Sequence, residues 1–112
     1  MNITVIGCGR WGSFLAWYLN KLNHDVTLYG RENSKKLKQF ELERTNGLVT
    51  LDDKIQLLSD LGKAVSSADI LVISIGVQNF RTLMEQLTTF NLNGKIIVLC
   101  MKGIEADTGK RL

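Results

Sequence analysis

The chain has 112 residues, enough for one domain and too few for a second of full size. Its 45% hydrophobic and 22% charged residues exclude disorder by composition. A net charge of +3 suits an anionic small ligand, but it is too small and too scattered to predict a nucleic-acid partner. Because no apolar run approaches the roughly 20 residues that a bilayer requires, we expect no membrane span.

The cysteines and the first residues bear on the redox environment. Cys8 and Cys100 lie in apolar, strand-like stretches and are predicted to be small buried thiols. No Cys and His residues occur at metal-ligand spacing, so no metal is expected. Met1 leads directly into a strand pattern without a basic leader and a long apolar region, which predicts a reducing, cytoplasmic location.

The first third of the chain predicts a strand, a helix and a second strand. Residues 2–6 are largely β-branched and are followed at once by glycines, as at the end of a short strand. Residues 10–23 follow a helical period, with one apolar stripe formed by Trp11, Leu15, Tyr18 and Leu22. Residues 25–29 form the second predicted strand, which Gly30 ends.

The middle of the chain is more polar. Residues 33–44 predict a short surface helix capped by Asn33 or Ser34. Residues 49–51 and 54–58 are candidate strands around a turn-like pair of aspartates.

The rest of the chain continues the alternation of helices and strands. Asp60 is a candidate cap for a short helix, and residues 70–75 form an apolar run typical of a parallel strand covered on both faces. Apolar residues between 80 and 87 mark another helix, and residues 95–101 a last strand. This order predicts an α/β fold of the Rossmann type, a doubly wound, mainly parallel sheet.

The loop after the first strand carries the clearest motif. Gly7-Cys8-Gly9-Arg10-Trp11-Gly12 fits G-x-G-x-x-G between a strand and a helix, the context of a dinucleotide site. Gly7 would permit the tight turn, Gly9 would let the backbone approach a pyrophosphate, and Gly12 would let the helix pack closely on the strand. The amides at the helix N-terminus would then bind the phosphates. A plain glycine turn is the alternative.

The residue after the second strand bears on cofactor choice. An acidic residue there would hold a ribose 2′-hydroxyl and select NAD. Arg31 follows instead, with Lys35 and Lys36 nearby, and an arginine can clamp a 2′-phosphate. NADP is therefore favoured over NAD. Glu32 leaves room for NAD, and a solvated basic turn is the alternative for Arg31.

These residues resemble the N-terminal cofactor domain of the bacterial type of NAD(P)-dependent glycerol-3-phosphate dehydrogenase. The last of four matching segments, a lysine-glycine motif, is the most specific and argues against the related ketopantoate reductases. The matching segments are residues 7–12, 27–31, 68–81 and 101–105 followed by Thr108 and Gly109.

The resemblance implies roles for individual positions. Beside the three glycines, Arg10, Trp11 and Arg31 would bind the cofactor, and Lys102 would meet both the cofactor and the substrate. Trp11 is either a core residue of its helix or a lid over the cofactor. Arg10 departs from the small residue usual in the family, and Gly76 and Val77 stand where the family usually has proline and a small polar residue. The family's general-base lysine lies in a second, helical domain, so no catalytic residue is expected in this chain.

The resemblance also implies an activity, hydride transfer between NAD(P)H and dihydroxyacetone phosphate or sn-glycerol 3-phosphate, a precursor of glycerophospholipids. Residues 1–112 would form one NAD(P)-binding Rossmann domain, incomplete at its C-terminus, truncated before the second domain and inactive alone. A homodimer of the full-length protein is compatible with it. The alternatives are a free-standing dinucleotide-binding module without catalysis, or half of another phosphate- or hydroxyacid-handling dehydrogenase.

Overall fold

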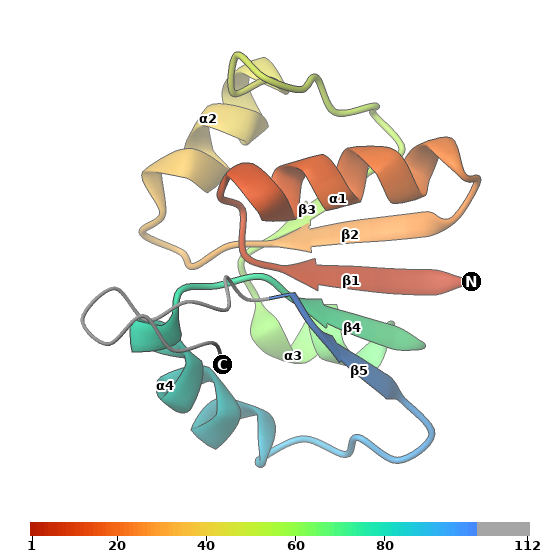
Figure 1. The fold of residues 1–112 in the computed structure, drawn as a ribbon, viewed down its shortest axis with the longest axis vertical. Coiled ribbons are helices and arrows are strands. Elements are labelled where there is room, and N and C mark those ends of the chain that lie inside the picture. The colour runs from red at the N-terminus through yellow and green to blue at the C-terminus, as the bar shows by residue number, and fades with distance from the viewer. Residues whose placement is uncertain (101–112) are drawn as a thin grey trace, which may run out of the picture.

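The computed structural model describes residues 1–100, which form a parallel sheet flanked by helices (Figure 1). Residues 101–112 lie outside the described part, as does the predicted lysine-glycine segment with them. The elements in chain order are β1 (Asn2–Ile6), α1 (Arg10–Lys21), β2 (Asp25–Tyr29), α2 (Lys35–Glu43), β3 (Gln56–Leu58), α3 (Leu61–Ser66), β4 (Ile70–Ile73), α4 (Val77–Leu87) and β5 (Ile96–Leu99).

The five described strands are parallel and lie in the order β3-β2-β1-β4-β5. The Rossmann-type prediction is therefore confirmed. In the register of the central strands, Ile6 at the end of β1 lies beside Tyr29 of β2 and Ile73 of β4. The chain leaves β1 toward β2 on one side and returns to β4 on the other. This reversal is a topological switch point, where the crevice outside the strand ends binds ligands in open α/β sheets.

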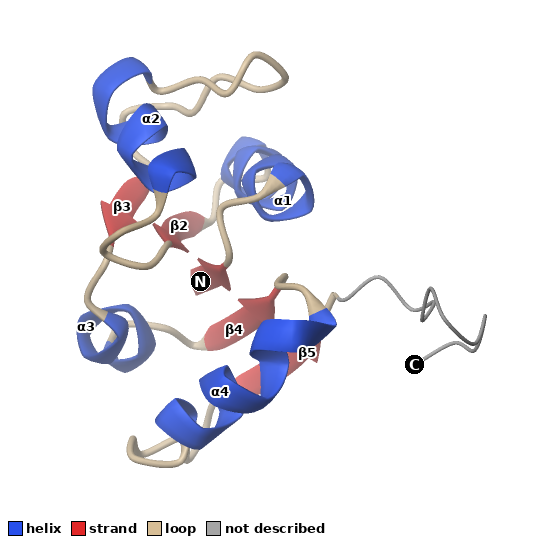
Figure 2. Cartoon of the chain, turned by 90° about the vertical axis from the view of Figure 1, so that its left-hand side faces the viewer, coloured by secondary structure: helices blue, strands red, loops and turns tan. Residues whose placement is uncertain are grey.

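Each face of the sheet has its own apolar core. Figure 2 shows α1 and α2 on one side and α3 and α4 on the other. Because side chains alternate along a strand, Ile3 and Val5 of β1 pack in the core under α1 and α2, whereas Ile6 packs in the core under α3 and α4. The Thr4 hydroxyl, also in β1, donates to the Ala64 carbonyl oxygen at 2.7 Å and so ties α3 to the sheet.

The buried face of α1 differs from the predicted apolar stripe. Its buried residues are small: Gly12, Ser13 and Ala16. Trp11, Tyr18 and Leu22 of the stripe are 52%, 47% and 50% exposed. Helix and sheet approach each other so closely here that large side chains do not fit between them. The interpretation of Trp11 as a core residue of its helix is therefore wrong.

The segment between α2 and β3 is a packed loop where the first of the two strands was predicted, at residues 49–51. Residues 49–51 make a single antiparallel bridge, from Thr50 to Thr45. The Asn46 side chain accepts hydrogen bonds from the amides of Leu48 and Val49, at 2.9 and 3.0 Å. Amides held in this turn are not available to a sheet ladder. Only residues 56–58 of the second predicted strand join the sheet.

The predicted N-caps of α2 and α3 are both present, and in each the side-chain oxygen of the N-cap residue accepts a hydrogen bond. Ser34 Oγ accepts from the Leu37 amide at the start of α2, and Asp60 Oδ1 accepts from the Lys63 amide at the start of α3, each at 3.2 Å. The last described strand, β5, pairs with β4, and all four of its residues are exposed. Within residues 1–100, no helix has the length and apolarity needed to cross a membrane.

The close approach of α1 makes Gly12 a position where any side chain should destabilise the fold. A Cβ there would collide with the Gly7 carbonyl oxygen, so we expect Gly12→Ala to lower the free energy of unfolding by about 3 kcal/mol. The matched control is Gly62→Ala within α3, where a Cβ would meet its nearest atoms at 3.4 Å. The control should be neutral or stabilising, because glycine costs a helix interior roughly 0.5–1 kcal/mol relative to alanine. Denaturant unfolding of both variants checks this, and equal stabilities would contradict it.

Candidate functional site

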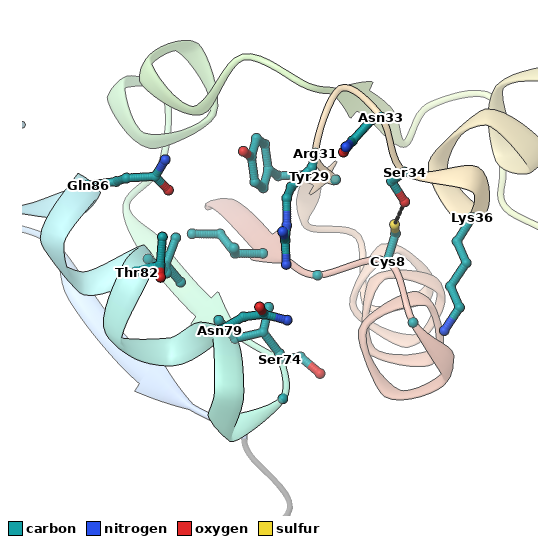
Figure 3. A pocket seen from close by; sticks show the side chains of 17 residues that line it. Cys8, Tyr29, Arg31, Asn33, Ser34, Lys36, Ser74, Asn79, Thr82 and Gln86 are labelled. Carbon is teal, nitrogen blue, oxygen red and sulfur yellow. Dashed lines mark hydrogen bonds between the residues drawn. The ribbon is translucent and has the colours of Figure 1, made fainter.

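A cavity of about 510 Å³ opens at the topological switch point. This volume lies in the usual range of small-molecule sites, roughly 300–1,000 Å³. Its walls come from the strand ends of β1, β2 and β4, the start of α2 and one side of α4 (Figure 3). The cavity thus joins segments from residue 6 to residue 86 at the carboxyl ends of the parallel strands.

Two of the three loop glycines are required by the fold itself. Gly7 has a φ of +116°, and a Cβ there would collide with the Ser74 carbonyl oxygen. The Gly7 carbonyl oxygen leaves no room for a side chain on Gly12. These contacts hold β1, β4 and α1 together where the cavity begins. The fold would therefore require glycine at both positions even in a plain turn that binds no ligand.

Gly9 is different, because the fold leaves room for a side chain there. Its φ of −75° suits any residue, and among the described residues other than its two chain neighbours, Lys36 Nζ is the one atom within 4 Å of a Cβ built on it, at 3.7 Å. Gly9 is also the N-cap of α1, where no side chain accepts a hydrogen bond from the first-turn amides. The helix therefore presents amides and the positive end of its dipole beside an open backbone surface, an arrangement that binds anions.

The loop after β2 closes the cavity next to the glycine loop. A Cβ on Gly30 would lie 2.8 Å from Cys8 Sγ and 2.9 Å from Leu37 Cβ, so α2 packs tightly against both segments. Cys8 Sγ also lies 3.3 Å from the Ser34 hydroxyl, as the dashed line in Figure 3 shows. Cys8 is buried, as predicted, and it fills the junction between the glycine loop and α2.

Tyr29 and Arg31 supply polar groups from the end of β2. In Figure 3 the Arg31 side chain extends into the space between α4 and the glycine loop. Burial raises the pKa of the Tyr29 phenol above its ordinary value; Arg31 lowers it and Asp60 raises it further. Since its ordinary pKa is already 10.0, the phenol is protonated at neutral pH and can donate a hydrogen bond.

The opposite wall carries polar residues that our sequence analysis missed. Asn79, Thr82 and Gln86 lie along the side of α4 that lines the cavity (Figure 3). Their spacing of three and four residues places them on one helix face, beside the apolar positions that we used to predict the helix. Gly76, the N-cap of α4, has a φ of −68°, a value that proline also adopts.

The predicted site residues divide into three groups. Gly7, Gly9 and Arg31 line the cavity, and Gly12 lies buried directly behind it. Arg10 and Trp11 instead line a separate apolar groove beside α1, together with Phe14, Trp17, Leu48, Val49 and Thr50. Lys102 lies outside the described residues.

Comparison with known proteins assigns the family. Residues 2–112 match the family model described as NAD-dependent glycerol-3-phosphate dehydrogenase N-terminus. The glycerol-3-phosphate dehydrogenase (NAD(P)+) of Prosthecochloris aestuarii is 36% identical over 124 residues, a match that covers all of this chain and 35% of the relative. The enzyme of the same name from Limosilactobacillus reuteri is 36% identical over 117 residues, which cover 98% of this chain and 34% of the relative.

Solved structures agree on the fold. The glycerol-3-phosphate dehydrogenase of Coxiella burnetii superimposes with a TM-score of 0.82 at 19% identity, over 95% of this chain and 34% of that one. The yeast glycerol-3-phosphate dehydrogenase superimposes with a TM-score of 0.79 at 24% identity, over all of this chain and 36% of that one.

The chain spans about a third of the length of the curated relatives that it matches. The matched part is the N-terminal one, in agreement with the glycine loop, the switch-point cavity and the strand order described above. The chain therefore belongs to the family of NAD-dependent glycerol-3-phosphate dehydrogenase N-terminal domains.

Proposed function

We propose that this chain is the dinucleotide-binding part of a glycerol-3-phosphate dehydrogenase, with NADP favoured over NAD. The observation that carries the proposal is Gly9. Nothing in the described fold requires a glycine at this position, yet its bare backbone faces the cavity at the start of α1. A cofactor pyrophosphate requires such a close approach to the second glycine of G-x-G-x-x-G. Relatives named as NAD(P)+-dependent enzymes support the same choice of ligand.

The cavity suggests how a dinucleotide would lie. Its adenosine half would rest over the end of β2, where Tyr29 and Arg31 offer a hydroxyl and a guanidinium. Its nicotinamide half would extend past Gly9 toward the end of β4 and the polar side of α4. A Cβ on Gly76 would meet no atom of residues 1–100 within 4 Å beyond its chain neighbours, so the described residues leave this second approach open as well. Arg10 would contribute its amide at the start of α1, since its side chain lines the separate groove.

For the whole protein we propose hydride transfer between the nicotinamide and the C2 carbon of dihydroxyacetone phosphate or glycerol 3-phosphate. The cofactor supplies the hydride chemistry, and this chain binds and orients it. The substrate pocket, including the role proposed for Lys102, and the general base depend on residues outside the described part. We also propose a cytoplasmic location and, for the full-length protein, a homodimer.

A second candidate function is a module that binds a dinucleotide without chemistry. The same cavity would serve it, because every feature described here concerns binding. The match to relatives three times as long favours the enzyme. Half of another hydroxyacid dehydrogenase is less favoured, since the family model matches residues 2–112.

The proposal predicts that a side chain at Gly9 blocks the cofactor without unfolding the protein. Gly9→Val should abolish NADPH and NADH binding in calorimetric titrations, because the valine would occupy the space required by the pyrophosphate. The thermal midpoint should change little, since a Cβ there meets no atom of the described residues beyond its chain neighbours closer than 3.7 Å. Gly9→Ala should give an intermediate affinity. Wild-type affinity in Gly9→Val would contradict the placement of the phosphates.

Arg31 should determine the preference for NADP. A charge-assisted hydrogen bond to a phosphate contributes on the order of 1.5–3 kcal/mol, and solvent exposure favours the lower end. Arg31→Ala should therefore weaken NADPH binding roughly ten-fold and NADH binding much less. Arg81→Ala on α4, which removes the same charge from outside the cavity lining, is the control. Equal losses for both cofactors would show that Arg31 contacts another part of the dinucleotide.

A further inference from the structure

We propose that Lys36 provides the cation that binds the cofactor pyrophosphate, a role that rests on the dinucleotide binding proposed above. The sequence alone gives Lys35 and Lys36 equal standing as basic residues near the end of β2. The structure separates them, because Lys36 lines the cavity and Lys35 does not. In Figure 3 the Lys36 side chain reaches from the first turn of α2 toward the start of α1.

The position of the amine matches the position expected for a phosphate oxygen. Lys36 Nζ lies 3.7 Å from the point where Gly9 would carry a Cβ. Gly9 is the residue whose missing side chain admits the pyrophosphate, so an oxygen in that space would lie within ion-pair distance of the amine. The free amides at the N-terminus of α1 would point toward the same phosphate along the helix axis. The phosphate would thus be held between a helix N-terminus and a lysine.

The backbone that carries Lys36 is fixed on both sides of the residue. Before it, the Ser34 hydroxyl caps α2 and lies 3.3 Å from Cys8 Sγ in the glycine loop. After it, Leu37 is only 2% exposed and packs against Gly30. The first turn of α2 is therefore attached to the glycine loop and to the end of β2. This attachment fixes the backbone from which the Lys36 side chain extends toward Gly9, so binding costs little backbone freedom.

The charge of the cavity supports an anionic group at this point. Among its described lining residues, Arg31 and Lys36 are the charged ones, and none is Asp or Glu. Two positive side chains without a carboxylate suit an anionic ligand, and they would raise the local concentration of a dinucleotide. Arg31 follows β2 directly, on the adenosine side, whereas Lys36 lies at Gly9. The two cations therefore address different phosphates.

The test compares two cofactors in three variants of the full protein. Lys36→Met removes the charge and keeps the length of the side chain, and Lys35→Met makes the same change one residue earlier, outside the cavity lining. Calorimetric titration should show that Lys36→Met weakens NADH and NADPH by a similar factor, roughly five- to ten-fold, because both contain the pyrophosphate. Lys35→Met should change neither by more than about two-fold. Lys36→Arg should restore most of the affinity.

Three results would overturn the assignment, and each has a different meaning. Unchanged affinities in Lys36→Met would make Lys36 a solvated surface lysine. A loss restricted to NADPH would place the amine at the 2′-phosphate instead of the pyrophosphate. If the wild-type protein bound neither cofactor, the proposed function would fail as well. Thermal midpoints measured on the same samples show whether a loss of affinity comes from unfolding.

Discussion

Gly12 and the Gly7 carbonyl oxygen approach each other so closely that their contact fixes the position of α1 against the sheet. No Cβ fits between them, so α1 lies as close to the end of β1 as two backbones allow. The same approach turns the small residues of α1 toward the sheet and its aromatic residues outward. It also directs the N-terminus of α1 at the crevice between β1 and β4. Folding and ligand placement are thus set by one steric condition.

The glycine loop divides its residues between these two tasks. Gly7 and Gly12 serve the fold, because their neighbours leave no room for a side chain. Gly9 has room and carries none. A motif match alone cannot make this distinction, since the three glycines are equivalent in G-x-G-x-x-G. The space around each glycine distinguishes Gly9 from the other two, and this difference favours a dinucleotide site over a plain turn.

Local signals in the sequence were enough to predict most of the elements. The strands at 2–6 and 25–29 have the predicted bounds because short β-branched runs end at turn residues. The caps at Ser34 and Asp60 follow from the hydrogen-bonding capacity of their side chains. The buried face of α1 was predicted wrongly because a hydrophobic period counts aromatic residues as core. It gives no weight to a glycine that draws the helix onto the sheet.

The remaining parts of the site required the fold. Asn79, Thr82 and Gln86 are about 70 residues from the glycine loop, and only the pairing of β4 with β1 places them across the cavity. Lys36 and Lys35 cannot be separated without knowing how α2 is rotated against the loop. The adjacent residues Arg10 and Trp11 belong to the motif, yet their side chains line another groove, since the helix directs them away from the cavity.

We expect a dinucleotide to bind across the end of β1 with its phosphates at Gly9. The most direct measurement is the change in backbone amide chemical shifts of isotope-labelled protein during titration with NADPH. The largest changes should fall on Gly9, Arg10 and Trp11 at the start of α1 and on Gly30 and Arg31 after β2. Changes confined to the groove lined by Phe14, Trp17 and Leu48, or no changes at saturating cofactor, would contradict it.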